Sequence, residues 1–189
     1  MFSAFLDANV LVPITLTDTL LRCASAGLFV PNWSGDVLRE VRFALLRIES
    51  HLGQARIDYR IGAMQTAFPQ ACVTGYETLV DTIHLPDPDD RHVIAAAHLA
   101  HDDTIVTANL KDFPAAELEL FNLVAISVDD FLCDMLDLFP SQLRQVIAGQ
   151  ANDTSDPPLS ESDILIGLGR AGAPKFVQAF RRVSDLGVA

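Results

Sequence analysis

The sequence predicts an α/β protein with a central parallel sheet covered by helices, followed by a C-terminal helical appendage. Short apolar runs alternate with segments of helical period up to residue 139, which is typical of right-handed βαβ crossovers. After Pro140 only helical patterns remain. Half of the 189 residues are apolar, so the chain can bury one substantial core. We expect a main domain over residues 1–139 and a helical extension over residues 140–189.

The N-terminal segment is expected to form a strand, a helix and a second strand. Phe2–Leu6 is a short apolar run that ends in polar residues, which is typical of a buried strand. A helix capped by Thr17–Asp18 should follow and end at Gly27. Leu28–Val30 then resembles a brief second strand, which Pro31 stops.

Two amphipathic helices should come next. Ser34 is a favourable N-cap, and apolar residues recur at helical spacing over Val37–Ile48. A further helix is expected over Gln54–Phe68, because the proline that follows cannot continue it. Residues 76–85 favour a short helix more weakly, since prolines follow closely.

An alanine-rich helix and two further strands complete the predicted sheet. An aspartate should cap the helix Arg91–His101, whose small residues allow close packing against strands. Thr104–Ala108 and Val124–Val128 are short apolar runs typical of buried strands. Asp129–Asp130 then begin a helix toward Leu138. In the tail, two more helices over residues 160–168 and 174–183 follow a polar linker.

The composition limits the classes of partner. A formal net charge of −12 argues against a broad basic surface that coats nucleic acid, because such binding neutralises phosphates with Lys and Arg. Contact with a polyanion would have to be local or bridged by cations. The arginines from Arg39 to Arg60 are its best landing place, and the alternative is that they form a solvated helix face.

The cysteines and the apolar runs bear on the cellular compartment. Cys23, Cys72 and Cys133 are widely spaced and odd in number, which is typical of a reduced chain rather than a disulfide framework or a zinc–thiolate site. No apolar run approaches the roughly 18 residues of a membrane span, and the N-terminus lacks the basic segment of a signal peptide. We expect a cytoplasmic protein with no membrane contact.

Four acidic residues stand where this fold could bring them together. Asp7 directly follows the first strand, Asp90 starts the alanine-rich helix, Asp112 follows the next strand, and Glu40 lies beside the apolar stripe of its helix. Carboxylates within about 5 Å of one another repel strongly unless a cation neutralises them. Oxygen ligands without paired histidines or cysteines favour Mg²⁺ or Mn²⁺.

The same stretches resemble those of PIN-domain ribonucleases, and more narrowly the VapC-like toxin branch of that family. The matching stretches are Phe5–Leu11, Val37–Val41, Leu85–Ala97 and Ile105–Pro114. They occur in the expected order over roughly residues 1–135, and the last two are the most specific. The resemblance implies a PIN-like three-layer α/β/α fold and a metal-dependent endoribonuclease that cuts phosphodiester bonds in single-stranded or structured RNA.

The resemblance also implies residue roles and partners. Catalytic roles fall to Asp7, Glu40, Asp90 and Asp112, of which Asp7, Asp90 and Asp112 would hold Mg²⁺ or Mn²⁺. Supporting positions are Asn9, Thr107 and Asn109. From their places in the sequence beside the acids, and not from the resemblance, we take Arg39, His92 and Lys111 as substrate contacts, with a packed structural role as the alternative for His92. The expected partners are RNA and a cognate antitoxin protein, and the helical extension is a hypothesis for antitoxin contact or homodimer formation. The alternatives are a loop cap for Asp7, a partly exposed helix acid for Glu40, a helix cap for Asp90 and a turn residue for Asp112.

Other classes of function compete with this interpretation. In the stretch Ile105–Pro114, the PIN pattern often has an aspartate just after the strand, where this chain has Asn109. A catalytically weak or inactive PIN fold that only binds RNA or protein is therefore an alternative. A haloacid-dehalogenase-like phosphatase also opens with an aspartate after an apolar strand. That family needs a second aspartate two residues later, where this chain has Asn9. A receiver-like module would need a paired acidic cluster that the first strand lacks.

Overall fold

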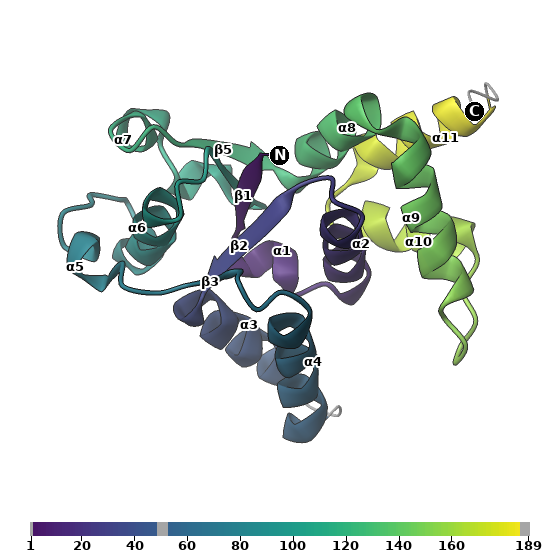
Figure 1. The fold of residues 1–189 in the computed structure, drawn as a ribbon, viewed down its shortest axis with the longest axis horizontal. Coiled ribbons are helices and arrows are strands. Elements are labelled where there is room, and N and C mark those ends of the chain that lie inside the picture. The colour runs from purple at the N-terminus through teal and green to yellow at the C-terminus, as the bar shows by residue number, and fades with distance from the viewer. Residues whose placement is uncertain (1, 49–52, 186–189) are drawn as a thin grey trace. The chain divides into compact units, whose positions relative to one another are not determined.

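The structure, a computed structural model, describes residues 2–48 and 53–185 (Figure 1). Its internal contacts group into two units. The first contains Phe2–Val12 and Val30–Ile126, and the second contains Pro13–Phe29 and the chain from Ser127 onward. The expected α/β class with a parallel sheet and additional C-terminal helices is confirmed. The division at residue 139 stays a prediction.

The first unit is built on a five-stranded sheet in the order β3-β2-β1-β4-β5. The strands are β1 (Ser3–Leu6), β2 (Val30–Ser34), β3 (Cys72–Val73), β4 (Thr104–Thr107) and β5 (Val124–Ser127). β1 pairs in parallel with β2 and β4, and β2 pairs in parallel with β3. The central strand is fully buried along Ala4–Leu6, as expected for a sheet covered on both faces.

Helices cover this sheet. They are α1 (Ala8–Leu11), α3 (Gly35–Ile48), α4 (Gln54–Ala67), α5 (Glu77–Val80), α6 (Arg91–Leu99) and α7 (Ala115–Glu119), with 3₁₀ turns η1 (Pro88–Asp90) and η2 (Leu110–Asp112). In Figure 1, α6 lies to one side of the strands and α1 to the other. α6 packs against β1, β2 and β4 through Val93–Ala97, which are fully buried, so the small alanines do allow the close packing that we expected.

The second unit is helical. It contains α2 (Ile14–Ser25), α8 (Val128–Leu138), α9 (Pro140–Asn152), α10 (Glu161–Arg170) and α11 (Pro174–Asp185). α11 packs against α8 and α10, while α2 packs against α9 and α10. Phe176 and Phe180 of α11 are buried, and their rings contact each other. Ser160 and Asp163 form a capping box that begins α10.

The second strand differs from the prediction, because β2 begins at Val30 and continues through Pro31. The N–H of Val30 donates to the carbonyl of Phe2, the residue just before β1, at 3.0 Å, so the nitrogen of Pro31 faces the other edge of β2. β3 pairs with β2 only at Trp33 and Ser34. At Pro31, therefore, no paired residue of β3 needs an N–H donor, and the proline does not stop the strand.

The first long helix also begins earlier than predicted. α2 starts at Ile14, and the backbone N–H of Thr17 donates to the carbonyl of Pro13 at 2.9 Å. Thr17 thus lies in the first turn and is not the cap. α1, α7 and the two-residue strand β3 were not expected, because segments this short carry no measurable periodicity. The predicted N-cap at Ser34 is confirmed, since its Oγ accepts the N–H of Val37 at 3.1 Å.

Two further observations concern the cysteines and the helices. Cys23, Cys72 and Cys133 are free thiols. Over residues 2–48 and 53–185, none of the helices combines the length and the apolar character that crossing a bilayer demands.

Candidate active site

The carboxylate of Asp7 lies where β1 meets β4. Leu6 is paired with Val106, and the N–H of Asp7 donates to the carbonyl of Val106 at 3.1 Å. Asp7 therefore lies beside Thr107, although the two residues are far apart in the sequence. Its side chain is only 5% exposed. Asp7 thus lies at the carboxyl ends of the parallel strands, where such folds usually place reactive groups.

Three hydrogen bonds orient the Asp7 carboxylate. Oδ1 accepts the N–H of Ala8 at 2.6 Å. Oδ2 accepts Nδ2 of Asn9 at 2.6 Å and the hydroxyl of Thr107 at 2.7 Å. A carboxylate has about four acceptor sites. Most of those of Asp7 are therefore occupied, and its orientation is held by groups from both strand ends.

A second set of hydrogen bonds connects the two strand ends behind Asp7. The hydroxyl oxygen of Thr107 accepts Nδ2 of Asn9 and the backbone N–H of Asn109, both at 3.0 Å. Oδ1 of Asn9 accepts the N–H of Ala108 at 2.8 Å. Asn9 and Thr107, predicted to support the site, thus lie in direct contact with its first acid.

Burial raises the pKa of Asp7 above its ordinary value. The hydrogen bonds from Thr107 and Ala8 oppose that rise, and the negative charge of Glu40 adds to it. The ionised carboxylate is consequently held in a place that disfavours its charge. A nearby cation would offset this cost.

Asp90 lies in the same acidic surroundings. It precedes α6, but its side chain makes no capping hydrogen bond, whereas the side chain of Asp87 caps the turn η1. The pKa of Asp90 is raised to about 6, first by burial and then by the negative charges of Asp7, Asp87, Asp112 and Glu40. Asp90 therefore does not serve as a simple helix cap, and the four acids act on it electrostatically.

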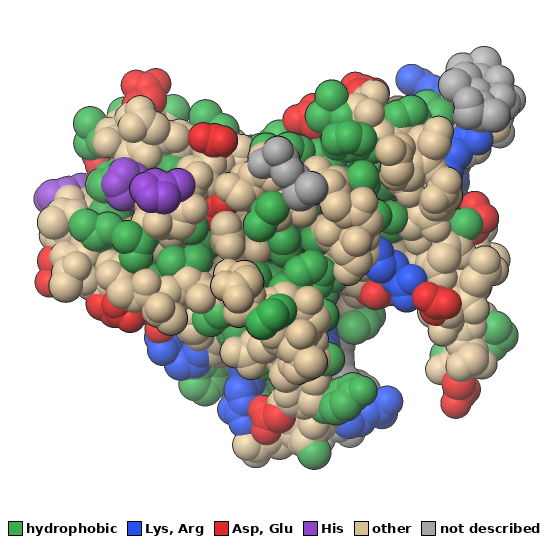
Figure 2. Space-filling model, viewed as in Figure 1, with side chains coloured by type: hydrophobic (Ala, Val, Ile, Leu, Met, Phe, Trp, Pro, Cys, Tyr) green, Lys and Arg blue, Asp and Glu red, His purple; other side chains and the backbone are tan. Residues whose placement is uncertain are grey.

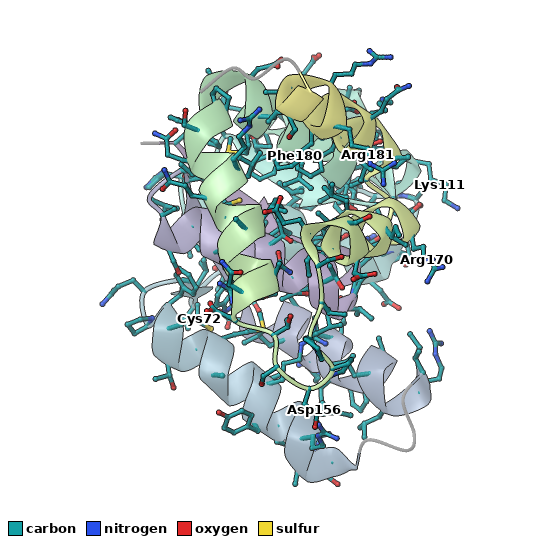
Figure 3. All side chains as sticks on the ribbon, turned by 90° about the vertical axis from the view of Figure 1, so that its right-hand side faces the viewer. Cys72, Lys111, Asp156, Arg170, Phe180 and Arg181 are labelled. Atoms are coloured by element: carbon teal, nitrogen blue, oxygen red, sulfur yellow. The ribbon has the colours of Figure 1, made fainter. Side chains whose placement is uncertain are left out.

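Asp112 and Asn109 are joined to each other. Asp112 ends η2, and its Oδ2 accepts Nδ2 of Asn109. The negative charge of Asp112 reaches Asp90. Lys111, predicted as a substrate contact, is exposed and extends away from the ribbon in Figure 3. Within the described part of the chain it makes no ion pair. Its ammonium group is free to meet an anion from solvent.

Glu40 and His92 form a pair beside these acids. Nε2 of His92 lies 2.7 Å from Oε1 of Glu40, with the imidazole side chain 10% and the carboxylate side chain 39% exposed. Burial works against protonation of His92, but the hydrogen bond to Glu40 and the charges of Glu40, Asp36 and Asp7 outweigh it and raise its pKa. Among the described residues, Nδ1 of His92 has no partner.

Sequence reasoning missed Asp36. Its carboxylate contacts Arg39 at 2.5 Å and accepts the hydroxyl of Tyr76 at 2.9 Å. Burial alone would raise the pKa of Asp36, but these two contacts outweigh it and lower that pKa below its ordinary value. The signal for it was its position four residues before Glu40, on the same face of α3. Arg39, the predicted substrate contact, is 60% exposed but already carries this acidic partner.

The comparisons with known proteins identify the family. Residues 3–111, more than half of the chain, match the PIN domain family. The chain belongs to the PIN domain family. The resemblance drawn from its motifs is thereby confirmed, and the PIN match contains Asp7, Glu40 and Asp90 and ends one residue before Asp112.

Similarity extends into the helical unit. Residues 128–182 match the VapC50 C-terminal domain. The chain is 40% identical over 98 residues to the "Putative ribonuclease VapC50" of Mycobacterium tuberculosis, a match that covers 52% of this chain and 57% of that protein. The match thus spans little more than half of that relative's length. No solved structure matches the chain.

The acidic residues of this PIN domain fit a hard divalent cation by their chemistry. They offer carboxylate oxygens without thiolates, and burial together with their mutual repulsion raises the pKa of Asp90. Within residues 2–48 and 53–185, however, no three His, Cys, Asp or Glu side chains stand close enough together to enclose a metal ion. Asp7, Asp90 and Asp112 thus share an electrostatic site whose ligand set is not closed by the side chains as they stand.

Proposed function

We propose that this PIN-domain protein is a Mg²⁺- or Mn²⁺-dependent endoribonuclease that hydrolyses phosphodiester bonds of single-stranded or structured RNA. The observation that carries the proposal is the convergence of negative charge on Asp90, whose pKa rises to about 6 beside a buried Asp7. Groups held at such a cost are typical of functional sites. The similarity to a relative named as a ribonuclease supports the choice of RNA.

The cation would be held by Asp7, Asp90 and Asp112. When bound, a divalent ion supplies a water of lowered pKa and stabilises negative charge on the scissile phosphate. The hydrogen bonds from Asn9 and Thr107 keep Asp7 in one orientation, so that its remaining acceptor site has a defined direction.

Glu40 is the best placed of these acids to move a proton. Oε1 interacts with His92, and Oε2 has no partner among the described residues, so Oε2 can accept a proton from the attacking water. The contact with His92 would hold the Glu40 carboxylate in place for that role. Lys111, which is exposed, would contact a phosphate of the substrate, and Arg39 would do so only by exchanging Asp36 for the phosphate.

Incubation of the purified full chain with single-stranded RNA and Mn²⁺ tests the proposal. We expect cleavage that EDTA abolishes and that Asp7→Asn and Asp90→Asn each reduce at least about a hundredfold. Asp137→Asn, an exposed aspartate of α8, is the matched control and should cut at the parental rate. Cleavage that survives EDTA and both site variants would contradict the assignment.

A binding module that does not cut RNA is the second candidate. It is favoured by Asn109, which takes the place of an acid and uses its amide on Asp112, and by the open ligand set. Retained RNA binding without any cleavage in Mg²⁺ or Mn²⁺ would select this alternative. Asn109→Asp should then raise cleavage above background, because it adds a fourth negative oxygen ligand.

We further propose that the protein is a cytoplasmic toxin held in check by an antitoxin. The VapC-like resemblance supports this, and α3 and α4 expose Phe43, Ile48 and Tyr59 by 60%, 62% and 79%. Exposed apolar surface of this kind marks protein contacts. Co-expression with a candidate antitoxin should yield a complex whose mass distinguishes an antitoxin partner from a homodimer, and Tyr59→Ser should weaken that complex.

A further inference from the structure

The last two helices carry an exposed basic surface that the proposed reaction does not use. We define the basic face as Arg170, Lys175, Arg181 and Arg182. From residue 164 to residue 184 the chain contains these four cations and no Asp or Glu, in a protein of net charge −12. Figure 2 shows Lys and Arg side chains beside the end of α11, and Figure 3 shows Arg170 and Arg181 extending from their helices. We propose that the basic face binds the phosphodiester backbone of RNA.

Helical geometry gathers the basic residues of α11 on one side. Lys175, Gln178 and Arg182 recur at intervals of three and four residues, and Arg181 lies next to them. They line a shallow hollow of about 540 Å³ together with Pro174 and Val177. The opposite side of the helix carries Phe176 and Phe180, which are buried. The polar and apolar sides are therefore cleanly separated.

α11 is anchored at both ends, so it presents these cations from a firm support. At its start, the carboxylate of Asp129 accepts the N–H groups of Lys175 and Phe176 at 3.1 and 2.8 Å. Near its end, the guanidinium of Arg144 donates to the carbonyl of Val183 at 2.5 Å. Anchoring reduces the entropy that the helix would lose on binding a ligand.

The arginines of the basic face are available, unlike most of those in the segment from Arg39 to Arg60. Arg39 contacts Asp36, Arg42 contacts Asp58, and Arg60 donates to the carbonyls of Leu11 and Val12. Each of these interactions occupies cationic charge or N–H donors that a polyanion would otherwise use.

By contrast, Arg170, Arg181 and Arg182 make no ion pair within the described part of the chain. Lys175 contacts Asp130 at 2.7 Å, but its side chain is 68% exposed. Such an exposed pair contributes little and can be exchanged for a phosphate. The structure thus moves the favoured landing place for a polyanion from the first unit to the second.

RNA is the occupant that charge favours, and this choice rests on the proposed function. The acidic site repels a polyanion, so substrate affinity needs a source of positive charge elsewhere in the protein. Contacts from these arginines to phosphates carry no sequence information, so the basic face would bind RNA without sequence preference. An acidic protein surface is the competing ligand.

Binding is measured with the full chain carrying Asp7→Asn, so that the RNA is not cut. Adding Arg181→Gln and Arg182→Gln should weaken the affinity for a single-stranded 20-mer by about tenfold at 0.1 M salt. The slope of log affinity against log salt should fall by roughly 0.7 for each phosphate that the variant no longer neutralises. The matched control is Arg47→Gln with Arg56→Gln, which removes the same charge from exposed arginines of the first unit.

The outcomes separate this inference from the proposed function. Unchanged affinity and slope in the Arg181/Arg182 variant, or an equal loss in the control, would overturn the inference. If the Arg181/Arg182 variant lost binding to an acidic protein but kept its affinity for RNA, the inference would be overturned too. Cleavage is measured separately with a protein that keeps Asp7 and carries Arg181→Gln and Arg182→Gln. This protein should lose activity on long RNA but not on a dinucleotide. Absence of all cleavage would defeat the proposed function alone, and equal melting temperatures exclude misfolding.

Discussion

Asp7 in the first unit and Asp129 in the second are both 5% exposed, and both lie just beyond a strand, yet their surroundings are opposite. The carboxylate of Asp129 accepts two N–H groups at the start of α11, where the helix dipole favours negative charge. The carboxylate of Asp7 is also hydrogen-bonded, but Glu40 and Asp90 add negative charge around it.

Burial alone therefore does not distinguish a structural carboxylate from a functional one. Asp129 has positive partial charges and a neighbouring acid, Asp130, that Lys175 already balances. Asp7 has acids for neighbours and lacks a cationic side chain at hydrogen-bond distance in the described residues. The first arrangement stabilises the fold, whereas the second leaves a repulsion between acids that a cation would offset.

The largest expected effect separates the two aspartates by activity. Asp7→Asn should lower RNA cleavage to background while the melting temperature stays within about 3 °C of the parent, because a buried like-charge repulsion is removed with the charge. Cleavage and circular-dichroism melts on the same preparation provide the measurement. A collapse of the melting temperature would give Asp7 the structural role that we assign to Asp129.

The next effect is on stability. Asp129→Ala leaves two N–H groups of α11 without their acceptor and should lower the free energy of unfolding by about 2 kcal/mol. For a chain of this size the melting temperature would drop by roughly 4–8 °C. Asp137→Ala, exposed on the same helix, should change it little. Cleavage per folded molecule should remain parental, and a loss there would erase the contrast with Asp7.

A smaller effect concerns pH. The folded protein raises the pKa of Asp90 from its ordinary 3.8 to about 6. Between these two pH values, the folded state therefore binds more protons than the unfolded state. In EDTA, the stability from this group is full below about pH 4 and is lost as the pH rises through 6. The loss should be about 1 kcal/mol after solvent screening.

Asp90→Asn should flatten that dependence in urea titrations from pH 4 to pH 7. Mn²⁺ should restore stability more at pH 7 than at pH 5, because the ion binds the ionised carboxylates of the native state. An Asp129→Asn protein serves as the comparison and should keep the parental fall between these pH values. The same fall in the Asp90→Asn protein would remove the electrostatic basis of the site.

The smallest effect concerns the hydrogen bond from the Asp163 N–H to Ser160 in the second unit. This bond is exposed, whereas the bonds to Asp129 are buried or partly buried. Ser160→Ala removes the hydroxyl that caps α10 and should cost about 0.5–1 kcal/mol, since the helix has other packing to hold it. RNA cleavage should not change. The variant Ser160→Thr keeps the hydroxyl and should melt within about 2 °C of the parent. Equal losses in both variants would show that shape, not the capping bond, sets the effect.

Local pattern sufficed to predict much of the fold. The apolar runs over Phe2–Leu6 and Thr104–Ala108 contain two paired strands, and the alanine-rich helix packs on the sheet as expected. Pro31 misled because the cost of a missing N–H depends on whether a neighbouring strand needs it. The predictions failed where an outcome depended on a partner distant in the sequence.

The order of residues along the chain was enough to show which segments are apolar, where helices and strands can form, and that acids follow the strands. It could not show that Leu6 pairs with Val106, which sets Asp7 against Thr107, or that Glu40 meets His92 rather than solvent alone. The limit is one of range. Periodicity and capping are interactions of neighbours along the chain, whereas strand order and the field at a carboxylate sum over groups that only folding brings close.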